Sequence, residues 1–342
     1  MRVLSSASCS TLVVALHAVG AAFAFRTSHT TSSLLSSRRN AGLLHSRGCQ
    51  VDAQRSTLSR TTLQMSNSDN DGTTTIVTAD DRPQAFATGY STNPSLAMAI
   101  EEATTSALAS LPPASNLQYE IDLAIVVASS LYDEPSKIVP TVINVVESSS
   151  GLYGYGGIRH LVGGTAGGVI GSRCLAASGK EDEDGKVQRE CQPVEAEATP
   201  SISVTLALLP DVELQTFHLD KEDVPEFDGD LTRSGDGGED WKKAVGLAGF
   251  GSTKNEDTTE EDKTDKKEED EPVFMIIPSP AFQNNLDDFL QGLQFAYPKG
   301  QTFGGVASTV SSFSRARIFA YSADKNSDSS STYGDGCIGV AL

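Results

Sequence analysis

The chain has 342 residues and a formal net charge of −19, and this length favours about two domains or one large one. Residues 1–65 hold seven arginines, no lysine and one acid, so the remainder carries 19 basic against 44 acidic residues. A surface this acidic repels nucleic acid and anionic lipid, which argues against nucleic-acid binding.

The N-terminal segment is predicted to be a targeting leader. Residues 11–25, TLVVALHAVGAAFAF, are mostly apolar and too short to span a bilayer, as in a secretory signal peptide. Residues 26–65 are rich in Ser, Thr and Arg, the composition of an organelle transit peptide. The junction GAAFAF resembles the Ala-Phe cleavage motif of algae whose plastid lies inside the secretory system. We expect removal of 1–65 and delivery to the plastid (chloroplast), with secretion as the alternative.

The first half of the mature chain alternates between helical and extended patterns. Residues 66–93 are polar and are predicted to be flexible. Apolar residues at helical spacing predict a helix over 96–108, and the continuous apolar run DLAIVVAS, residues 122–129, is typical of a buried strand. A second helix is predicted over 135–148, followed by a glycine-rich stretch that leads into HLVGGTAGGVIG, residues 160–171.

The middle of the chain combines a predicted hairpin with charged insertions. The alternating run SISVTLALLP predicts a strand that a Pro210-Asp211 turn joins to a second strand over 212–219. Residues 178–198 and 220–271 are rich in charge and are predicted to be disordered insertions. Trp241 and the following AVGLAGFG interrupt the second insertion as a candidate docking element.

The last part of the chain repeats the order of the first. A buried strand over 271–280 and an amphipathic helix over 282–297 precede QTFGGVAS, residues 301–308, and strands follow at 315–321 and 336–342. Both halves read buried strand, helix, short strand ending in Gly-Gly, and further strands. The predicted fold class is therefore α/β, with two tandem strand–helix–strand–GlyGly–strand units forming mixed β-sheets with flanking helices. The apolar last strand is expected inside a sheet.

These elements and their order resemble the N-terminal half of the FIST domain, a sensory module. The resemblance spans residues 94–342 and rests on the VGGTAGGVIG turn, the SVTLALLP strand, the YP-x-x-x-x-FGG element and the closing GCIGVAL. It implies a non-enzymatic sensor of small ligands, with amino acids as the proposed ligands and haem in some members. The family continues into a C-terminal half, whereas this chain ends at Leu342. A surface facing the missing half predicts a homodimer or a separately encoded partner.

The glycines do not match a known phosphate-binding loop. GxxxxGK[ST] does not occur, and GGTAGGVIG lacks the GxGxxG spacing. We favour a structural bend between packed strands. In the alternative interpretation, both Gly-Gly turns converge and offer backbone amides to a small carboxylate ligand. The candidate ligand-binding residues are Ser129, Arg159, His160, Gly163, Gly164, Thr165, Gly167, Gly168, Ser279, Gly304 and Gly305.

Each candidate side chain has a structural interpretation beside the functional one. His160 is a hydrogen-bonded structural histidine or a ligand of an anion or haem iron. Arg159 and Arg315 are solvated, or they pair with a ligand carboxylate. Ser129 and Ser279 occupy equivalent strand ends, where they cap the following turn or bind the ligand.

The cysteines and serines offer no catalytic pattern. Cys9 and Cys49 lie in the leader, and the other three have no spacing typical of a metal site. Among them only Cys174 and Cys191 are candidates for a disulfide. Cys337 has no neighbouring base, and no GxSxG elbow occurs. We therefore expect no catalytic residue and no metal. The alternatives to a ligand-binding sensor are a scaffold that uses its acidic insertion and a haem-binding sensor.

Overall fold

The same series of elements occurs twice in this chain. The computed structural model describes residues 83–112, 119–181, 187–225, 237–247, 271–324 and 331–342, so the predicted leader lies outside it. The first series is β1 (Ala85–Ser91), α2 (Leu96–Leu108), β2 (Tyr119–Ser129), α3 (Ile138–Ser148) with a short α4 (Ser150–Tyr153), β3 (Tyr155–Ala166) and β6 (Ile202–Leu208). The second is β7 (Gln215–Leu219), α5 (Gly237–Ala244), β8 (Val273–Pro278), α6 (Leu286–Ala296), β9 (Gln301–Gly304) and β12 (Cys337–Ala341).

The two series build sheets of the same strand order. Sheet 1 begins β1-β6-β2-β3, and sheet 2 is β7-β12-β8-β9. In both sheets the third and fourth strands of this order are parallel, β2 with β3 and β8 with β9, and the other pairs named here are antiparallel. The predicted α/β fold with mixed sheets is therefore confirmed. Each repeat begins one strand and one helix earlier than the sequence pattern indicates.

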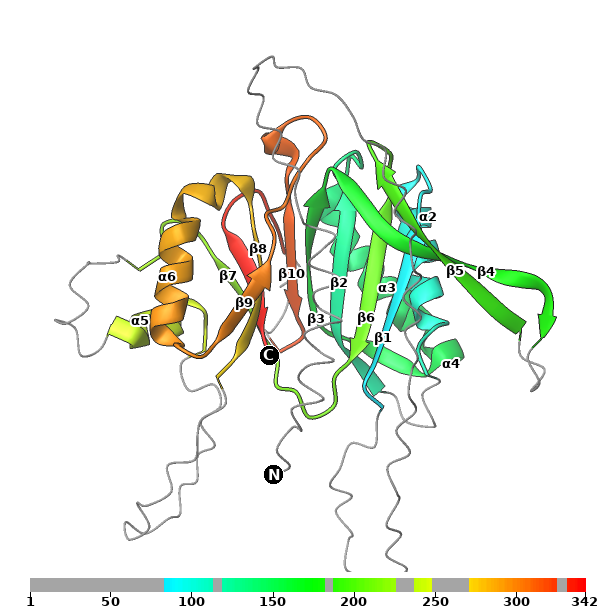
Figure 1. Ribbon diagram of the computed structural model, residues 1–342, viewed down its shortest axis with the longest axis horizontal. Helices are drawn as coiled ribbons and strands as arrows, with labels where there is room; N and C mark the ends of the chain where they lie inside the picture. The colour runs from blue at the N-terminus through cyan, green and yellow to red at the C-terminus, as the bar shows by residue number, and fades with distance from the viewer. Residues whose placement is uncertain (1–82, 113–118, 182–186, 226–236, 248–270, 325–330) are drawn as a thin grey trace, which may run out of the picture. The chain divides into compact units, whose positions relative to one another are not determined.

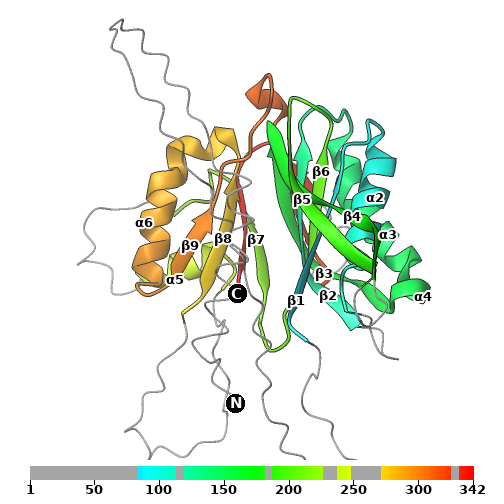
Figure 2. The same ribbon diagram turned by 45° about the vertical axis from the view of Figure 1, so that its right-hand side comes forward.

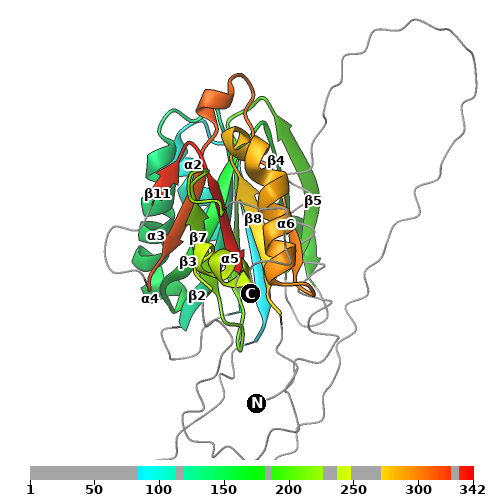
Figure 3. The same ribbon diagram turned by 90° about the vertical axis from the view of Figure 1, so that its left-hand side faces the viewer.

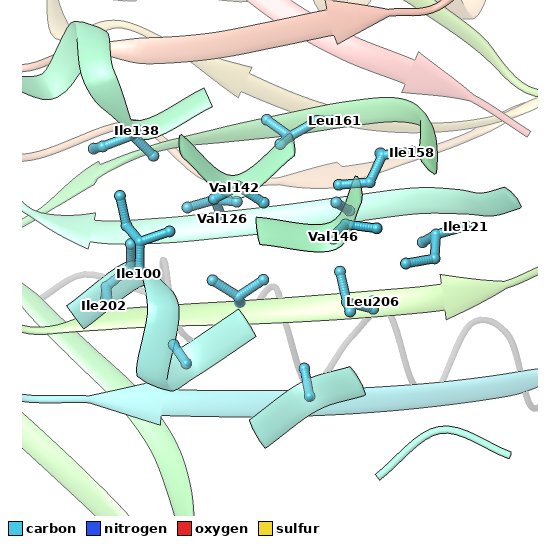
Figure 4. Packing of buried hydrophobic residues seen from close by; sticks show 14 of the residues in the cluster. Ile100, Ile121, Val126, Ile138, Val142, Val146, Ile158, Leu161, Ile202 and Leu206 are labelled. Carbon is cyan, nitrogen blue, oxygen red and sulfur yellow. The ribbon is translucent and has the colours of Figure 1, made fainter. Parts of the chain in front are cut away.

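Apolar cores hold the layers together. The helices α2 and α3 cover one face of sheet 1, and α5 and α6 cover one face of sheet 2 (Figures 1 and 3). The remaining faces of the two sheets pack against each other, with Leu123 and Ile125 of β2 in one core with Met275 and Ile277 of β8 (Figure 2). Burial of these side chains supplies the main driving force for folding. Figure 4 shows the core under α2 and α3, where Ile100 and Val142 meet Val126 of β2.

A pair of strands is inserted at the same place in each repeat. β10 (Ile318–Ser322) and β11 (Ser331–Tyr333) lie between β9 and β12 in the chain and extend sheet 1 beyond β3. β4 (Gly168–Glu181) and β5 (Val187–Glu197) lie between β3 and β6 and form a separate two-stranded sheet. The prediction of disorder over 178–198 is therefore wrong for the described residues, because its charged residues sit in a paired hairpin.

Two other expectations fail, each for its own reason. The segment 66–93 contains β1, whose buried positions are the small residues Ala87, Gly89 and Ser91, so it lacks an apolar pattern. The predicted hairpin of 202–208 with 212–219 does not form, because β6 lies in sheet 1 and β7 in sheet 2. Local patterns do not reveal which sheet a strand joins.

The acidic segment 220–271 also contains a helix. α5 lies inside it, and Trp241, Val245 and Leu247 are buried in the core beneath α6. Parts of this segment, residues 226–236 and 248–270, lie outside the described residues. The last strand, β12, is paired on both sides by β7 and β8, which confirms its predicted interior position.

Candidate functional site

The two Gly-Gly segments occupy equivalent positions in the repeats. Gly163 of β3 is opposite Val126 of the parallel strand β2, and Gly304 of β9 is opposite Ile276 of β8. A Cβ atom on Gly163 would lie 2.0 Å from the carbonyl oxygen of Val126, and one on Gly304 would lie 1.8 Å from that of Ile276. These glycines therefore sit inside or at the end of a strand and let neighbouring backbones approach closely, which differs from the bend that we favoured.

The chain segments that follow the two glycine pairs converge. The amide of Ser308 donates to the carbonyl oxygen of Thr165 over 2.9 Å, and Gly167 N donates to the hydroxyl of Ser308 over 3.0 Å. A Cβ on Gly164 would lie 3.4 Å from the Cβ of Ala307. The structure thus brings the two Gly-Gly segments together where β3 and β8 end.

The backbone amides at this junction already have partners within the chain. Thr165 N donates to the carbonyl oxygen of Arg317 over 2.8 Å, and Gly305 N to that of Ile276 over 3.2 Å. Gly167 N is held by Ser308, and Gly168 belongs to the β4–β5 ladder. These bonds anchor the 305–317 loop, the segment that joins β9 to β10. A carboxylate ligand would therefore need side-chain donors from this loop.

The 305–317 loop exposes charged, polar and apolar groups together. Arg315 donates from Nη2 to Asp133 Oδ1 over 3.0 Å, and both side chains are exposed. Phe313 is 78 % exposed and Val310 is 40 % exposed, although both are apolar. The amide of Val310 donates to the hydroxyl of Ser130 over 3.0 Å, which ties the loop to the end of β2. The loop is anchored at its base and presents its tip to solvent.

The two equivalent serines have structural partners. Ser129 Oγ accepts from the amide of Leu131 over 3.3 Å. Ser279 Oγ accepts from the amide of Phe282 over 3.3 Å at the start of the 3-10 turn Pro280–Asn285, and it donates to Asp335 Oδ1 over 3.3 Å. Both serines are buried. This geometry is that of side chains that close a turn at a strand end.

His160 lies about 10 Å from Gly163 along the extended strand, between the two sheets. Its Nδ1 is 2.8 Å from Thr216 Oγ1 on β7, and its Nε2 is 3.6 Å from Asp324 Oδ2. The ring is 1 % exposed. Because both ring nitrogens face polar protein groups, His160 does not fit an axial ligand of haem iron, and it links the two repeats instead.

Arg159 faces carboxylates of its own chain. Its Nη1 lies 3.7 Å from Asp122 Oδ1, and its Nε lies 4.0 Å from Glu120 Oε2. Asp122 is buried and also accepts the amide of Leu209 over 2.8 Å. Arg159 is thus positioned to balance a buried carboxylate at the start of β2. Sequence reasoning missed Asp122, although an acid at the head of an apolar strand signals a buried polar contact.

A pocket of about 180 Å³ lies elsewhere, between α6 and the β8–β9 pair. It contains none of the candidate ligand-binding residues. Its lining residues are Phe274, Leu290, Leu293, Gln294, Tyr297, Gly300 and Thr302. Burial, with a smaller contribution from the charge of Glu239, raises the pKa of Tyr297 to about 12, so this hydroxyl stays protonated near neutral pH.

Among the described residues, no group of three or more His, Cys, Asp or Glu side chains could hold a metal ion. In the same part of the chain, every helix is too short or too polar to cross a bilayer.

Cys337 is expected to be chemically inert in the folded protein. Its side chain is fully buried in β12, and burial raises the pKa of its thiol well above the usual range. We expect an aromatic disulfide reagent at pH 8 to leave Cys337 unmodified in the native state and to modify it in urea. Modification is measured by mass spectrometry of the tryptic peptide that contains Cys337. Rapid labelling of Cys337 without urea would contradict its burial.

Comparison with models of known protein families finds no match for this chain. Comparison with curated proteins also finds no match.

Proposed function

We propose that this chain is a non-enzymatic domain that binds a small zwitterionic ligand of amino-acid size at the 305–317 loop. The observation that carries the proposal is the exposed pair of Arg315 and Asp133, with 3.0 Å between Nη2 and Oδ1, in a loop that also exposes the ring of Phe313. A guanidinium has five N–H donors, so Arg315 can hold Asp133 and a ligand carboxylate together. Asp133 can then accept the ligand's ammonium group.

The apolar side chains of the loop complete the match to an amino acid. Phe313 and Val310 provide apolar surface for the ligand's side chain, and burying that surface favours binding. The resemblance to FIST sensory modules supports the same ligand class. The convergence of the two Gly-Gly segments supplies a rigid base, because hydrogen bonds from Thr165 and Gly167 hold the loop.

Thermal unfolding with each of the twenty amino acids tests this function. A ligand at 100 times its Kd stabilises the folded state by about 2.7 kcal/mol, which raises Tm by several degrees. We expect Arg315→Ala and Asp133→Ala to abolish the shift. Lys137→Ala is the matched control, because Lys137 and Glu134 form a similarly exposed ion pair with 2.7 Å between Nζ and Oε1.

A further variant distinguishes binding at the 305–317 loop from binding in the pocket beside α6. Thr302 is exposed and lines that pocket, so Thr302→Trp would fill it without touching the loop. We expect the ligand-induced shift to survive in this variant. If no amino acid raises Tm at millimolar concentration, or if only Thr302→Trp removes the effect, the proposed function at the loop is wrong.

A scaffold that recruits a basic partner through the acidic segment 220–271 is the second candidate. The negative charge of this segment favours it, since charge complementarity steers association and weakens with salt. Its test has to spare α5, which is packed into the core. Deletion of residues 248–270 alone is therefore the informative variant. A salt-sensitive interaction that disappears with this deletion would support the scaffold.

A further inference from the structure

The backbone register of the β4–β5 hairpin places two cysteines directly opposite each other. Cys174 of β4 pairs with Cys191 of β5 in an antiparallel ladder. The register is continuous from Gly168, opposite Glu197, to Ala176, opposite Arg189. Directly opposed residues in such a ladder have Cα atoms about 4.5 or 5.5 Å apart. Both separations fall within the range of about 4.4–6.8 Å that a disulfide needs.

We infer that Cys174 and Cys191 form a reversible cross-strand disulfide, a redox site that fixes the β4–β5 hairpin. A slip of one residue in the register would place Cys174 opposite Glu190 or Gln192, and the pair would be lost. Cys174 therefore lies opposite Cys191 because of the β4–β5 register alone.

The hairpin has a structural need for such a bond. A two-stranded sheet is marginally stable by itself in water. The start of β4 is anchored, because Val169 is buried between the sheets and a Cβ on Gly171 would lie 2.4 Å from the ring of Tyr90. Cys174 comes three residues after Gly171 in the chain. A bond at this position would extend the fixed register toward the tip of the hairpin.

The chemistry is thiol–disulfide exchange with a small disulfide such as oxidised glutathione. One cysteine thiolate attacks the small disulfide, forms a mixed disulfide and releases one small thiol. The second cysteine then attacks the mixed disulfide at the first cysteine's sulfur, forms the internal S–S bond and releases the other small thiol. The two cysteines lose two electrons and two protons, which the two released thiols carry. A reduced dithiol reverses the reaction. Cys337 is buried in another sheet and does not compete for this bond.

Peptide mapping of the full chain under non-reducing conditions tests the bond. After incubation with oxidised glutathione, the remaining free thiols are blocked and the protein is digested with trypsin. Cleavage after Arg173, Lys180 and Arg189 separates the peptide that carries Cys174 from the one that carries Cys191. We expect the two peptides to be joined, with a mass two hydrogens below their sum, and to separate on treatment with dithiothreitol. The Cys337→Ser variant should give the same joined peptide.

A second experiment measures how easily trypsin cleaves the β4–β5 hairpin in the native protein, so it does not depend on the folding of a variant. Limited trypsin digestion of the native protein should cleave at Lys180 and Lys186 at least ten times more slowly after oxidation. The Cys174→Ser, Cys191→Ser double variant should show no dependence on redox state. If Cys174 and Cys191 each carry glutathione without a joined peptide, or if the bond links two chains, the inference is wrong. Equal cleavage rates in both redox states would also count against it.

Discussion

Replacing Gly163 with alanine is expected to lower the free energy of unfolding by more than about 3 kcal/mol. The added Cβ would lie 2.0 Å from the carbonyl oxygen and 2.9 Å from the carbonyl carbon of Val126, both backbone atoms of the neighbouring parallel strand. Backbone in the middle of a sheet cannot move without breaking its ladder. The cost should therefore exceed the roughly 1–3 kcal/mol of ordinary overpacking, against a total stability of about 5–15 kcal/mol.

Gly157→Ala is the matched control for this prediction. Gly157 lies in the same strand, β3, but an added Cβ would have no atom within 4 Å. We expect its free energy of unfolding to stay within about 0.5 kcal/mol of the parent value. Urea unfolding followed by far-ultraviolet circular dichroism measures both variants. Equal midpoints for Gly163→Ala and Gly157→Ala would show that the strands do not approach as closely as the structure indicates.

Gly304 extends the same test to the second repeat. Its added Cβ would lie 1.8 Å from the carbonyl oxygen of Ile276, and its φ of +146° is one that other residues rarely adopt. Because Gly163 and Gly304 hold equivalent places, their alanine variants should be destabilised to a similar degree. Similar losses would show that Gly163 and Gly304 are both needed for stability, whatever ligand the 305–317 loop binds.

The sequence predicts those parts of the fold whose pattern is local. The run DLAIVVAS forms β2 because apolar residues suit a strand covered on both faces, and apolar residues at helical spacing form α6. β1 was missed because its buried positions are Ala87, Gly89 and Ser91, which carry no apolar signal. Pairing partners were missed because they are set by contacts distant in sequence.

The candidate site also has a part that the sequence predicts and a part that depends on contacts distant in sequence. The sequence pattern alone identifies the two Gly-Gly segments as equivalent. It does not reveal that Gly167 N donates to Ser308, since these residues are 141 positions apart. The partners of Arg159 and His160 were hidden for the same reason: Asp122 and Thr216 come from other strands. Tertiary contacts turn these two candidate ligands into bridges between elements.

Truncation of Trp241 should lower the free energy of unfolding nearly as much as a core substitution in a central strand. This is expected although Trp241 lies in the most acidic part of the chain. Trp241 is 3 % exposed, and its ring centroid lies 6.4 Å from that of Phe289 on α6. A Cβ on Gly292 would lie 2.2 Å from the indole ring, so α6 has a glycine where the tryptophan packs. We expect Trp241→Ala to lower the free energy of unfolding by about 3–5 kcal/mol.

Lys243→Ala is the control on the same helix, because Lys243 is exposed and its ion pair with Asp240, 3.7 Å long, contributes little. Thermal unfolding followed by circular dichroism compares the two variants. Gly292→Ala should be destabilised as well, because its methyl group would displace the indole ring of Trp241. A Trp241→Ala variant as stable as Lys243→Ala would mean that α5 is not part of the core. If the expected loss is found, α5 supplies to sheet 2 the cover that α2 supplies to sheet 1. The acidic segment 220–271 then contains a helix of the core, and a variant that tests this segment as a partner-binding site has to keep α5.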